Sequence, residues 1–219
     1  MKVLNLYACL GGNRLLWDNC EVTAVELDEE LARLYQERFP NDKVIVADAH
    51  QYLLDHYQEF DFIWSSPPCP THSRARFARR NTTSAVYPDM KLYEEILFLQ
   101  KWFNGKYCVE NVIPYYEPLI PAKKRGRHLY WTNFNLPQVL SDRHVLIGSN
   151  KKEQKTSDIN HEFKALCKFH EFDFSRYKGK QRIDKVARNL VDYEAGKTIF
   201  EAARGIIANQ KNTNQSKLF

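Results

Sequence analysis

The sequence lacks the marks of a secreted, membrane or metal-binding protein. Its first residues, Met1 to Leu6, hold no apolar run of the signal-peptide kind, and no apolar run elsewhere approaches the length that spans a membrane. The five cysteines are an odd number and include no Cys-x-x-Cys pair, which argues against a disulfide framework and against a structural zinc site. We therefore expect a cytoplasmic protein with free thiols and no bound metal.

The composition is that of a globular protein, and its charge is uneven. With 43% hydrophobic and 27% charged residues, the 219 residues suffice for one main domain with a sizeable core. Residues 151–188 hold eleven Lys and Arg against six Asp and Glu, an excess equal to the net charge of +5 of the whole chain. A second basic cluster extends from His72 to Arg80. Such segments suit a polyanionic partner, although most charge runs are simply solvated surfaces.

Apolar runs alternate with amphipathic segments along most of the chain, which favours a Rossmann-like α/β fold with a mixed, mostly parallel sheet. Asp28 stands where the N-cap of the first helix is expected. Strands are predicted over Val3–Tyr7, Glu21–Val25, Lys43–Ala47, Phe62–Ser66, Lys106–Val112 and His128–Phe134. Helices are predicted over Glu29–Phe39, Ala49–Tyr57, Pro88–Phe103 and Tyr193–Ile207.

A glycine turn, Ala8 to Asn13, follows the first predicted strand, and we expect it to lead into a helix. Two glycines alone are a weak signal, since they occur in many turns. Two acids at the ends of the next two strands, Glu26 and Asp48, strengthen the case for a nucleotide-binding turn. Glu26 is placed to accept the hydroxyls of a ribose. A dinucleotide site needs one acid there, whereas a second acid suits an adenine amino group. The pattern therefore favours S-adenosylmethionine over a nicotinamide cofactor.

The strand that begins at Phe62 ends in Pro67-Pro68-Cys69. Because proline has no amide donor, the strand must stop at about Ser66, and the thiol then lies in a loop at the edge of the sheet where ligands bind. A thiol in that position acts as a nucleophile if its pKa is lowered. A lone cysteine is more often a buried structural residue, so partners elsewhere in the chain must decide.

Further charged residues stand close to strand ends. Glu110 lies near the end of the strand Lys106–Val112, although a single acid there is more often a surface residue. Arg125 and Arg127 alternate at the entry to the strand His128–Phe134, so both side chains are expected on one face. There they could orient a carboxylate and a phosphate.

Taken in order, these motifs resemble those of the cytosine carbon-5 methyltransferase family, and of its compact phage and prophage members in particular. The resemblance covers most of the chain. Its first motif is similar to Asn5-Leu6-Tyr7-Ala8-Cys9-Leu10-Gly11-Gly12, where the family usually has Asp for Asn5, Phe for Tyr7 and Gly for Cys9. The later motifs match Pro67-Pro68-Cys69, Glu110-Asn111-Val112, Arg125-Gly126-Arg127 and Arg188-Asn189-Leu190-Val191, with Lys123 where Gln is common and Arg188 where Gly is usual.

The resemblance implies methylation of cytosine at carbon-5 in DNA with S-adenosylmethionine, through a covalent bond from Cys69 to carbon-6 of a base flipped out of the duplex. Glu110 would hydrogen-bond the ring, while Arg127 and Arg125 would hold the base and lower the pKa of the thiol. The cofactor would contact Tyr7, Ala8, Cys9, Leu10, Gly11, Gly12, Glu26, Leu27, Asp48, Ala49, Pro68, Asn189 and Val191. The nucleic acid would contact Ser73, Arg74, Arg76, Arg79, Arg80, Arg176, Lys178, Lys180 and Arg182.

The segment 136–185 is polar, basic and weakly periodic, unlike the rest of the chain. We predict that it is a small target-recognition module inserted between residues 1–135 and 186–208 of a catalytic domain, with residues 209–219 as a frayed tail. The module is short for the family, which implies a short or loose target sequence. We expect the protein to be a monomer.

Three alternatives stay open on the sequence alone. One branch of the family modifies tRNA, and nothing in the residues separates the two substrates. DNA amino-methyltransferases also have paired prolines, but they carry an aromatic residue where Cys69 stands and have no role for Glu110-Asn111-Val112. A catalytically weak nucleic-acid-binding relative is the third alternative, against which the joint presence of Cys69, Glu110 and Arg127 argues.

Overall fold

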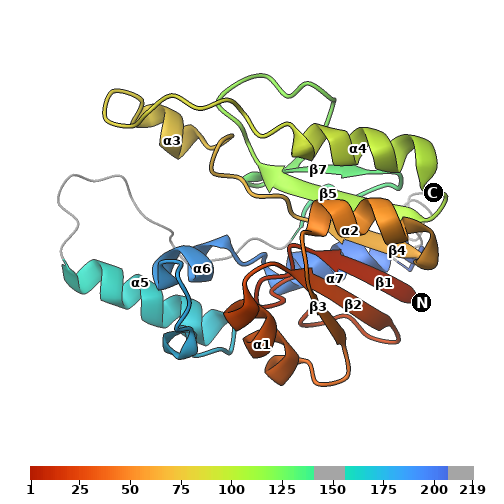
Figure 1. The fold of residues 1–219 in the computed structure, drawn as a ribbon, viewed down its shortest axis with the longest axis horizontal. Coiled ribbons are helices and arrows are strands. Elements are labelled where there is room, and N and C mark those ends of the chain that lie inside the picture. The colour runs from red at the N-terminus through yellow and green to blue at the C-terminus, as the bar shows by residue number, and fades with distance from the viewer. Residues whose placement is uncertain (141–155, 207–219) are drawn as a thin grey trace, which may run out of the picture.

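The computed structural model describes residues 1–140 and 156–206, with the side chains of residues 156–160 left outside the description. Within these ranges, seven strands form one sheet in the order β3-β2-β1-β4-β5-β7-β6 (Figure 1). Strand β7 is antiparallel to both of its neighbours, β5 and β6, and the other strand pairs are parallel. This confirms the mixed, mostly parallel sheet predicted from the sequence. The strands are β1 (Lys2–Leu6), β2 (Glu21–Glu26), β3 (Lys43–Val46), β4 (Phe62–Ser65), β5 (Lys106–Val112), β6 (Lys123–Arg125) and β7 (His128–Thr132).

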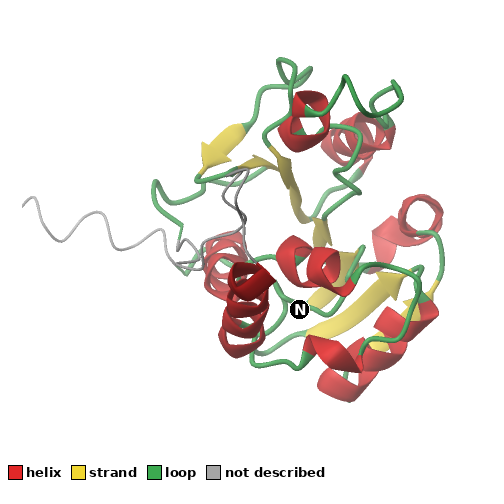
Figure 2. Ribbon diagram, turned by 90° about the vertical axis from the view of Figure 1, so that its left-hand side faces the viewer, coloured by secondary structure: helices red, strands yellow, loops and turns green. Residues whose placement is uncertain are grey.

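Helices cover both faces of the sheet (Figure 2). Helices α2 (Ala49–His56) and α4 (Lys91–Trp102) pack on one face, and α1 (Glu29–Arg38) and α7 (Tyr193–Ala203) pack on the other. Strand β4 shows the alternation that makes this possible, because Ile63 contacts the first pair of helices while Phe62 and Trp64 contact the α7 side. Burial of each such side chain stabilises the fold by about 1.5–3 kcal/mol.

The sequence locates the main elements well. All six predicted strands and all four predicted helices are present, and Asp28 caps α1 by accepting the backbone N–H groups of Glu30 and Leu31. Among these elements, the largest boundary error is at the C-terminal end of α7, which stops at Ala203 instead of Ile207. Gly205 follows with a φ of +75°, a left-handed conformation that ends helices and that glycine adopts without strain.

The glycine turn after β1 does not lead into a helix, and that prediction is wrong. Residues 7–20 form successive turns, in which the N–H of Gly11 binds the carbonyl of Ala8 and the N–H of Arg14 binds the carbonyl of Gly11. Tyr7, Cys9 and Gly11 all have positive φ, so a right-handed helix cannot begin there.

Helix α7 packs tightly against this turn region. A Cβ atom at Gly196 would lie 2.3 Å from the carbonyl oxygen of Asn13, so α7 approaches the turn more closely than any other residue type would allow. Trp17 stacks on Phe200 of α7 at 5.1 Å between ring centroids and donates its indole N–H to the carbonyl of Gly196. The C-terminal helix therefore covers the sheet beside the turn, where a helix after β1 was expected.

The described part of 136–185 is more regular than its sequence suggests. It contains helix α5 (Thr156–Phe169) and a short 3-10 turn, η2 (Phe174–Arg176), and leads into α6 (Ile183–Asn189). Its buried residues Leu166 and Phe174 share one apolar cluster with Leu10 and Leu34. The segment thus packs onto α1 and the glycine turn. Residues 141–155 and the predicted tail 209–219 lie outside the described residues.

The remaining short elements are a 3-10 turn, η1 (Tyr57–Glu59), and the five-residue helix α3 (Arg74–Ala78). Helix α3 lies in the predicted basic loop and begins at Ser73, whose hydroxyl accepts the N–H of Ala75. None of the helices in residues 1–140 and 156–206 has the length and apolar character needed to cross a membrane.

Candidate functional site

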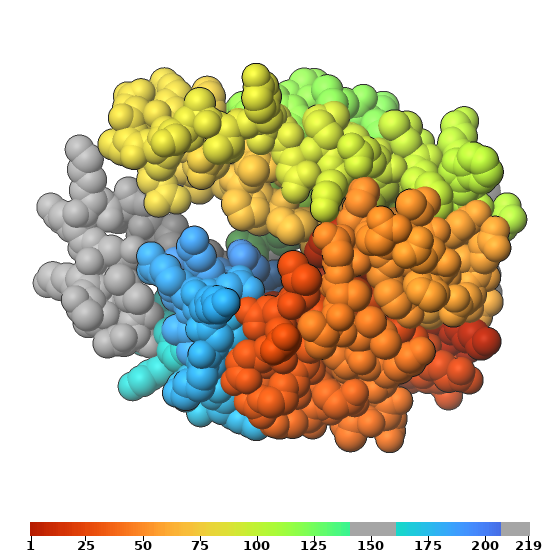
Figure 3. Space-filling view, in the orientation of Figure 1, coloured from red at the N-terminus to blue at the C-terminus, as the bar shows by residue number. Residues whose placement is uncertain are grey.

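The carboxyl ends of the parallel strands open onto one cavity of about 1340 Å³. Asn5 of β1, Glu26 of β2 and Glu110 of β5 line it, together with the loop that follows β4. Figure 3 shows the hollow between the yellow segment that contains α3 and the blue segment that contains α6. This is the edge of an open α/β sheet at which ligands bind.

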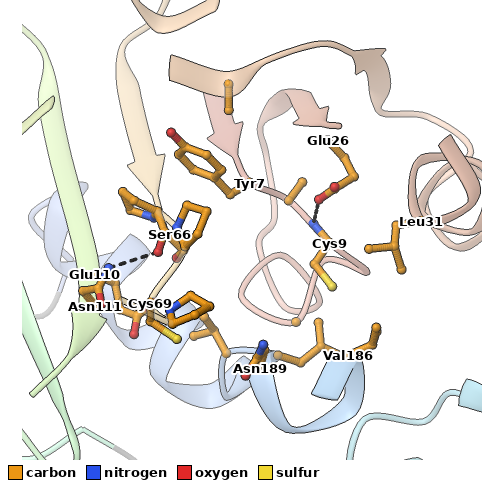
Figure 4. Close-up of a pocket in the computed structure, with 18 of the residues that line it drawn as sticks. Tyr7, Cys9, Glu26, Leu31, Ser66, Cys69, Glu110, Asn111, Val186 and Asn189 are labelled. Atoms are coloured by element: carbon orange, nitrogen blue, oxygen red, sulfur yellow. Dashed lines mark hydrogen bonds between the residues drawn. The ribbon is translucent and has the colours of Figure 1, made fainter. Parts of the chain in front are cut away.

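Glu26 lies at one end of the cavity. We call this the donor end, because the sequence predicts that the methyl donor binds beside Glu26. Its carboxylate accepts the backbone N–H of Cys9 at 2.8 Å and that of Asp28 at 2.9 Å (Figure 4). Burial raises the pKa of Glu26, and the two N–H groups oppose that shift. Each carboxylate oxygen keeps a further lone pair, so Glu26 can still accept two hydroxyl groups from a ligand.

The second predicted acid lies at the same end and is also partly engaged. Asp48 caps α2 by accepting the N–H groups of His50 and Gln51, and its other oxygen lies 3.5 Å from the ammonium of Lys91. These contacts lower the pKa of Asp48, with the N–H of Gln51 as the largest cause, so the group is a fixed anion at neutral pH. The predicted neighbours Leu27 and Ala49 also line the cavity.

The two glycines of the turn allow close packing within the protein. A Cβ atom at Gly11, where φ is +66°, would lie 2.4 Å from the ring of Phe39. A Cβ atom at Gly12 would lie 2.4 Å from the carbonyl oxygen of Val191. Gly12 lines the cavity, whereas Gly11 and the fully buried Leu10, which were also predicted to contact the cofactor, do not.

Cys69 lies at the opposite end, which we call the thiol end. Figure 4 shows it beside Asn111 and Glu110, away from Glu26. The amide of Asn111 donates to the carbonyl of Pro67 at 3.0 Å, so the loop after β4 is held by β5. The carbonyl of Cys69 in turn accepts the N–H of Ser73 at 3.1 Å. These two hydrogen bonds therefore hold the turn that carries the Cys69 thiol.

The electrostatics of the thiol differ from the prediction. Burial raises the pKa of Cys69, the negative charge of Glu110 raises it further, and the positive charge of Arg127 lowers it by less. Arg127 thus lowers the pKa of the thiol as predicted, but burial and Glu110 outweigh it in the protein without substrate. At neutral pH Cys69 is a protonated thiol, since its pKa lies above the ordinary value.

The two predicted arginines do not point to one face. Arg127 lines the cavity, whereas the guanidinium of Arg125 donates to the carbonyls of Pro137 and Lys124 and lies outside it. Gly126 between them has a φ of +54°, and this left-handed turn breaks the alternation that a strand would impose. Arg125, also predicted to be catalytic, holds a loop in place outside the cavity.

The basic residues after Cys69 divide into two groups. Ser73 and Arg74 line the cavity, although Arg74 also donates to the carbonyl of Pro114. His72 is fully buried, with Nδ1 2.5 Å from the hydroxyl of Tyr116, and burial lowers its pKa, so it does not add positive charge to the basic cluster predicted from His72 to Arg80. Three arginines lie outside the cavity on or just after α3, namely Arg76, Arg79 and Arg80.

The second basic segment divides in the same way. Lys180 lines the cavity, as do the predicted cofactor residues Asn189 and Val191. Arg176 forms an ion pair with Glu37, and Arg182 forms one with Asp184 at 3.0 Å. Lys178, like these two arginines, does not line the cavity.

Sequence reasoning missed a titratable residue beside Glu110 and another beneath the donor end. His128 lies with Nε2 3.6 Å from the carboxylate of Glu110, because β7 places His128 opposite Val112 of β5. Its position directly after Arg127 is the signal that was available. Glu95 is fully buried beneath the donor end, and its place among the apolar residues of a helix was the signal there.

Comparison with known proteins supports the resemblance. Residues 1–96 match the family model described as C-5 cytosine-specific DNA methylase. No curated protein matches the chain. The solved structure of Entamoeba histolytica methyltransferase EhMeth is similar over 94% of this chain and 98% of its own, with a TM-score of 0.52 and 10% identity, and this similarity concerns the fold.

Two further structures share shorter stretches. A mutant of Spodoptera frugiperda DNMT2 is 24% identical over 51% of this chain and 35% of its own, with a TM-score of 0.37. A putative DNA modification methyltransferase encoded within an E. coli prophage is 20% identical over 53% of this chain and 34% of its own, with a TM-score of 0.36. The chain thus spans about a third of the length of each. The resemblance to the cytosine C-5 methylases is confirmed for residues 1–96, and the fold of EhMeth is shared over nearly the whole chain.

Proposed function

We propose that the protein methylates carbon-5 of cytosine in DNA, with S-adenosylmethionine as the methyl donor and Cys69 as the nucleophile. The observation that carries this proposal is that Cys69, Glu110 and Arg127 line the same cavity as Glu26 and Asp48. A nucleophile, a group that can hydrogen-bond a pyrimidine, and a nucleoside-binding edge therefore share one space. We expect the enzyme to act in the cytoplasm as a monomer.

The donor end fits S-adenosylmethionine in its chemistry. Glu26 has lone pairs for the two ribose hydroxyls, and the fixed anion Asp48 can accept the adenine amino group. Leu31 and Val186 line the cavity and provide apolar surface for the adenine ring. When bound, the cofactor would supply an electrophilic methyl group.

At the thiol end, Cys69 would add to carbon-6 of the base and so make carbon-5 nucleophilic. Glu110 would hydrogen-bond the ring at N3 and the exocyclic amine, and Arg127 would hold the base. In the free protein, burial and, after it, the charge of Glu110 raise the pKa of the thiol and keep it protonated. Engagement of Glu110 by the base removes part of that opposition, so the thiolate forms where the substrate is bound. Loss of the carbon-5 proton and of the Cys69 bond would then release the product.

The substrate base must leave the duplex, at a cost of about a few kcal/mol. Ser73, Arg74 and Lys180 line the cavity and are placed to contact the flipped nucleotide and its phosphates. The arginines of α3 extend the positive charge from this position across the adjacent surface. This distribution of charge supports a nucleic acid as the substrate.

The test is the trapping of a covalent adduct on duplex DNA that carries 5-fluorocytosine. Because fluorine replaces the proton that must leave, the bond to Cys69 cannot be released, and we expect a denaturation-resistant adduct that requires S-adenosylmethionine. Cys69→Ser should form none, and Glu110→Ala should form much less. Cys108→Ser is the matched control, since Cys108 is fully buried in an apolar cluster and does not line the cavity.

A parallel reaction with tRNA that carries 5-fluorocytosine separates the two substrate classes. Adducts on tRNA alone would contradict the proposed DNA substrate while leaving the chemistry intact. Methyl transfer by Cys69→Ser at the wild-type rate would contradict the covalent mechanism. Methyl transfer to exocyclic nitrogen, with no adduct, would identify an amino-methyltransferase instead.

A further inference from the structure

Helix α4 carries a carboxylate that is buried beneath the donor end. The side chain of Glu95 is fully shielded from solvent. It accepts the hydroxyl of Tyr7 at 2.5 Å on one oxygen and the hydroxyl of Ser65 at 2.6 Å on the other, and His50 Nδ1 lies 3.0 Å from the first oxygen. A buried carboxyl group is strongly unfavourable unless it is paired and hydrogen-bonded, so the fold tolerates Glu95 there only while these partners stay in place.

The three partners come from three different segments that line the cavity. Tyr7 is the first residue after β1 and itself lines the donor end. Ser65 is the last residue of β4, directly before the loop that leads to Cys69. His50 follows Asp48 and Ala49 at the start of α2. One carboxylate therefore joins the segments that carry the predicted cofactor residues.

Tyr7 is the partner on which the geometry depends most. Its φ is +55°, a conformation that costs a non-glycine residue free energy and persists only where the surroundings impose it. In Figure 4 its ring lies between Ser66 and Glu26, so a shift of Tyr7 would change the space between the two ends of the cavity. The hydrogen bond to Glu95 fixes the far end of that ring.

We propose that Glu95 is a positioning residue for the methyl-donor site, which it shapes through Tyr7, Ser65 and His50, and that the charge of His50 sets the pH range in which it does so. The inference rests on the proposed function in one respect, that the ligand of the donor end is S-adenosylmethionine. Glu95 itself touches no ligand, since it lies outside the cavity lining.

The charges around His50 give the sign of the pH effect. Glu95 and Glu94 of α4 both contact its ring, with Glu94 3.3 Å from Nε2, while Lys91 of the same helix and Asp48 of the α2 cap lie nearby as an ion pair. The hydrogen bond to Glu95 is the largest cause that raises the pKa of His50, and burial and Lys91 oppose it. The imidazolium that pairs with Glu95 is therefore present at low pH and lost as the pH rises through this raised pKa.

The experiment measures the dissociation constant of S-adenosylmethionine by calorimetry from pH 6 to pH 9 in the full chain. We expect Glu95→Gln and Tyr7→Phe to weaken binding by about tenfold or more near pH 6.5, which corresponds to one lost hydrogen bond to a charged group. The KM for the donor should rise more than kcat falls. Wild-type affinity should decrease as the pH rises, and in Glu95→Gln this decrease should disappear.

Glu94→Gln is the matched control, because Glu94 is the next residue on the same helix and contacts His50 but neither Tyr7 nor Ser65. Its affinity at pH 6 should stay within about twofold of wild type, since no bond to the donor site is lost, while its pH profile should move to lower pH because Glu94 also raises the pKa of His50. Should Glu95→Gln fail to fold, Tyr7→Phe carries the test, because it removes a single hydroxyl.

Two outcomes separate the inference from the proposed function. If wild type binds the donor while Glu95→Gln and Tyr7→Phe bind it equally well with the same pH profile, the inference is overturned and the proposed function stands. A lowered melting temperature with an unchanged dissociation constant has the same meaning, because it shows a purely structural role. If wild type binds no S-adenosylmethionine at any pH, both fail together.

Discussion

The two ends of the cavity differ in how complete they are without a ligand. At the donor end, Glu26 already accepts two backbone N–H groups, and Asp48 caps a helix. At the thiol end, the one basic group within 4 Å of the Glu110 carboxylate, in the described part of the chain, is His128 at 3.6 Å. The thiol of Cys69 is held in its protonated state. One end is organised by the protein, and the other lacks partners that a base would supply.

This difference has a chemical meaning. A preorganised site binds its ligand with little rearrangement, so under the proposed function the donor end would hold the cofactor before any nucleic acid arrives. A free thiolate would be open to alkylation and oxidation, and the raised pKa of Cys69 limits this in the protein without substrate. The comparison therefore predicts that donor binding and thiol reactivity can be changed separately.

Replacement of Cys69 by Ser should have the largest effect and should affect one end alone. Because a serine hydroxyl is a far weaker nucleophile than a thiolate, methyl transfer in a single turnover should fall by about a thousandfold or more. The dissociation constant of S-adenosylmethionine should not change, since Cys69 lies at the other end of the cavity. Equal losses of binding and chemistry would contradict the separation of the two ends.

Replacement of Glu26 by Ala should remove donor binding and leave the thiol end intact. At a hundredfold excess over the dissociation constant, the donor should stabilise wild type by about 2.7 kcal/mol, and this stabilisation should vanish in the variant. Thermal unfolding with and without S-adenosylmethionine measures it. The control is the rate at which iodoacetamide alkylates Cys69, which should match that of wild type. A full thermal shift in Glu26→Ala would place the cofactor elsewhere.

The pH dependence of alkylation sharpens the account of the thiol end. Below the raised pKa of Cys69, the thiolate fraction and the rate should rise by about tenfold per pH unit. Glu110→Gln removes a charge that raises this pKa, so its profile should move to lower pH. Arg127→Gln removes a charge that lowers it, so its profile should move to higher pH. Mass spectrometry at Cys69 distinguishes this thiol from the four others, and shifts in the opposite directions would refute the assignment.

The sequence predicts those parts of the fold and site that depend on local pattern. Strand β4 and the loop with Cys69 follow from an apolar run that ends in two prolines, and the Asp28 cap follows from a polar residue before a helical repeat. Glu26 and Asp48 were found because parallel strands end at one edge of a sheet. The meeting of Cys69 with Glu110 in one cavity depended on the family resemblance more than on any local signal.

The remainder depends on contacts between distant segments. No local pattern shows that Trp17 stacks on Phe200, so the absence of a helix after β1 could not be foreseen. Arg125 and Arg127 separate because Gly126 takes a left-handed conformation within a strand-like stretch. Glu95 sits on an apolar helix face, and the partners that tolerate its charge come from three separate segments.

The smallest predicted effect concerns the basic residues between 176 and 182, which the structure divides. Lys180 lines the cavity, whereas Arg182 is paired with Asp184 at 3.0 Å. Lys180→Ala should flatten the salt dependence of duplex DNA binding by about 0.9 in the slope of log K against log salt. Arg182→Ala should change this slope less, because the acid paired with Arg182 repels phosphate. Binding titrations at several salt concentrations, with the donor present throughout, give both slopes. Equal slopes for wild type and both variants would make this segment a solvated surface, and would assign the phosphate contacts to Arg74 and the arginines of α3 instead.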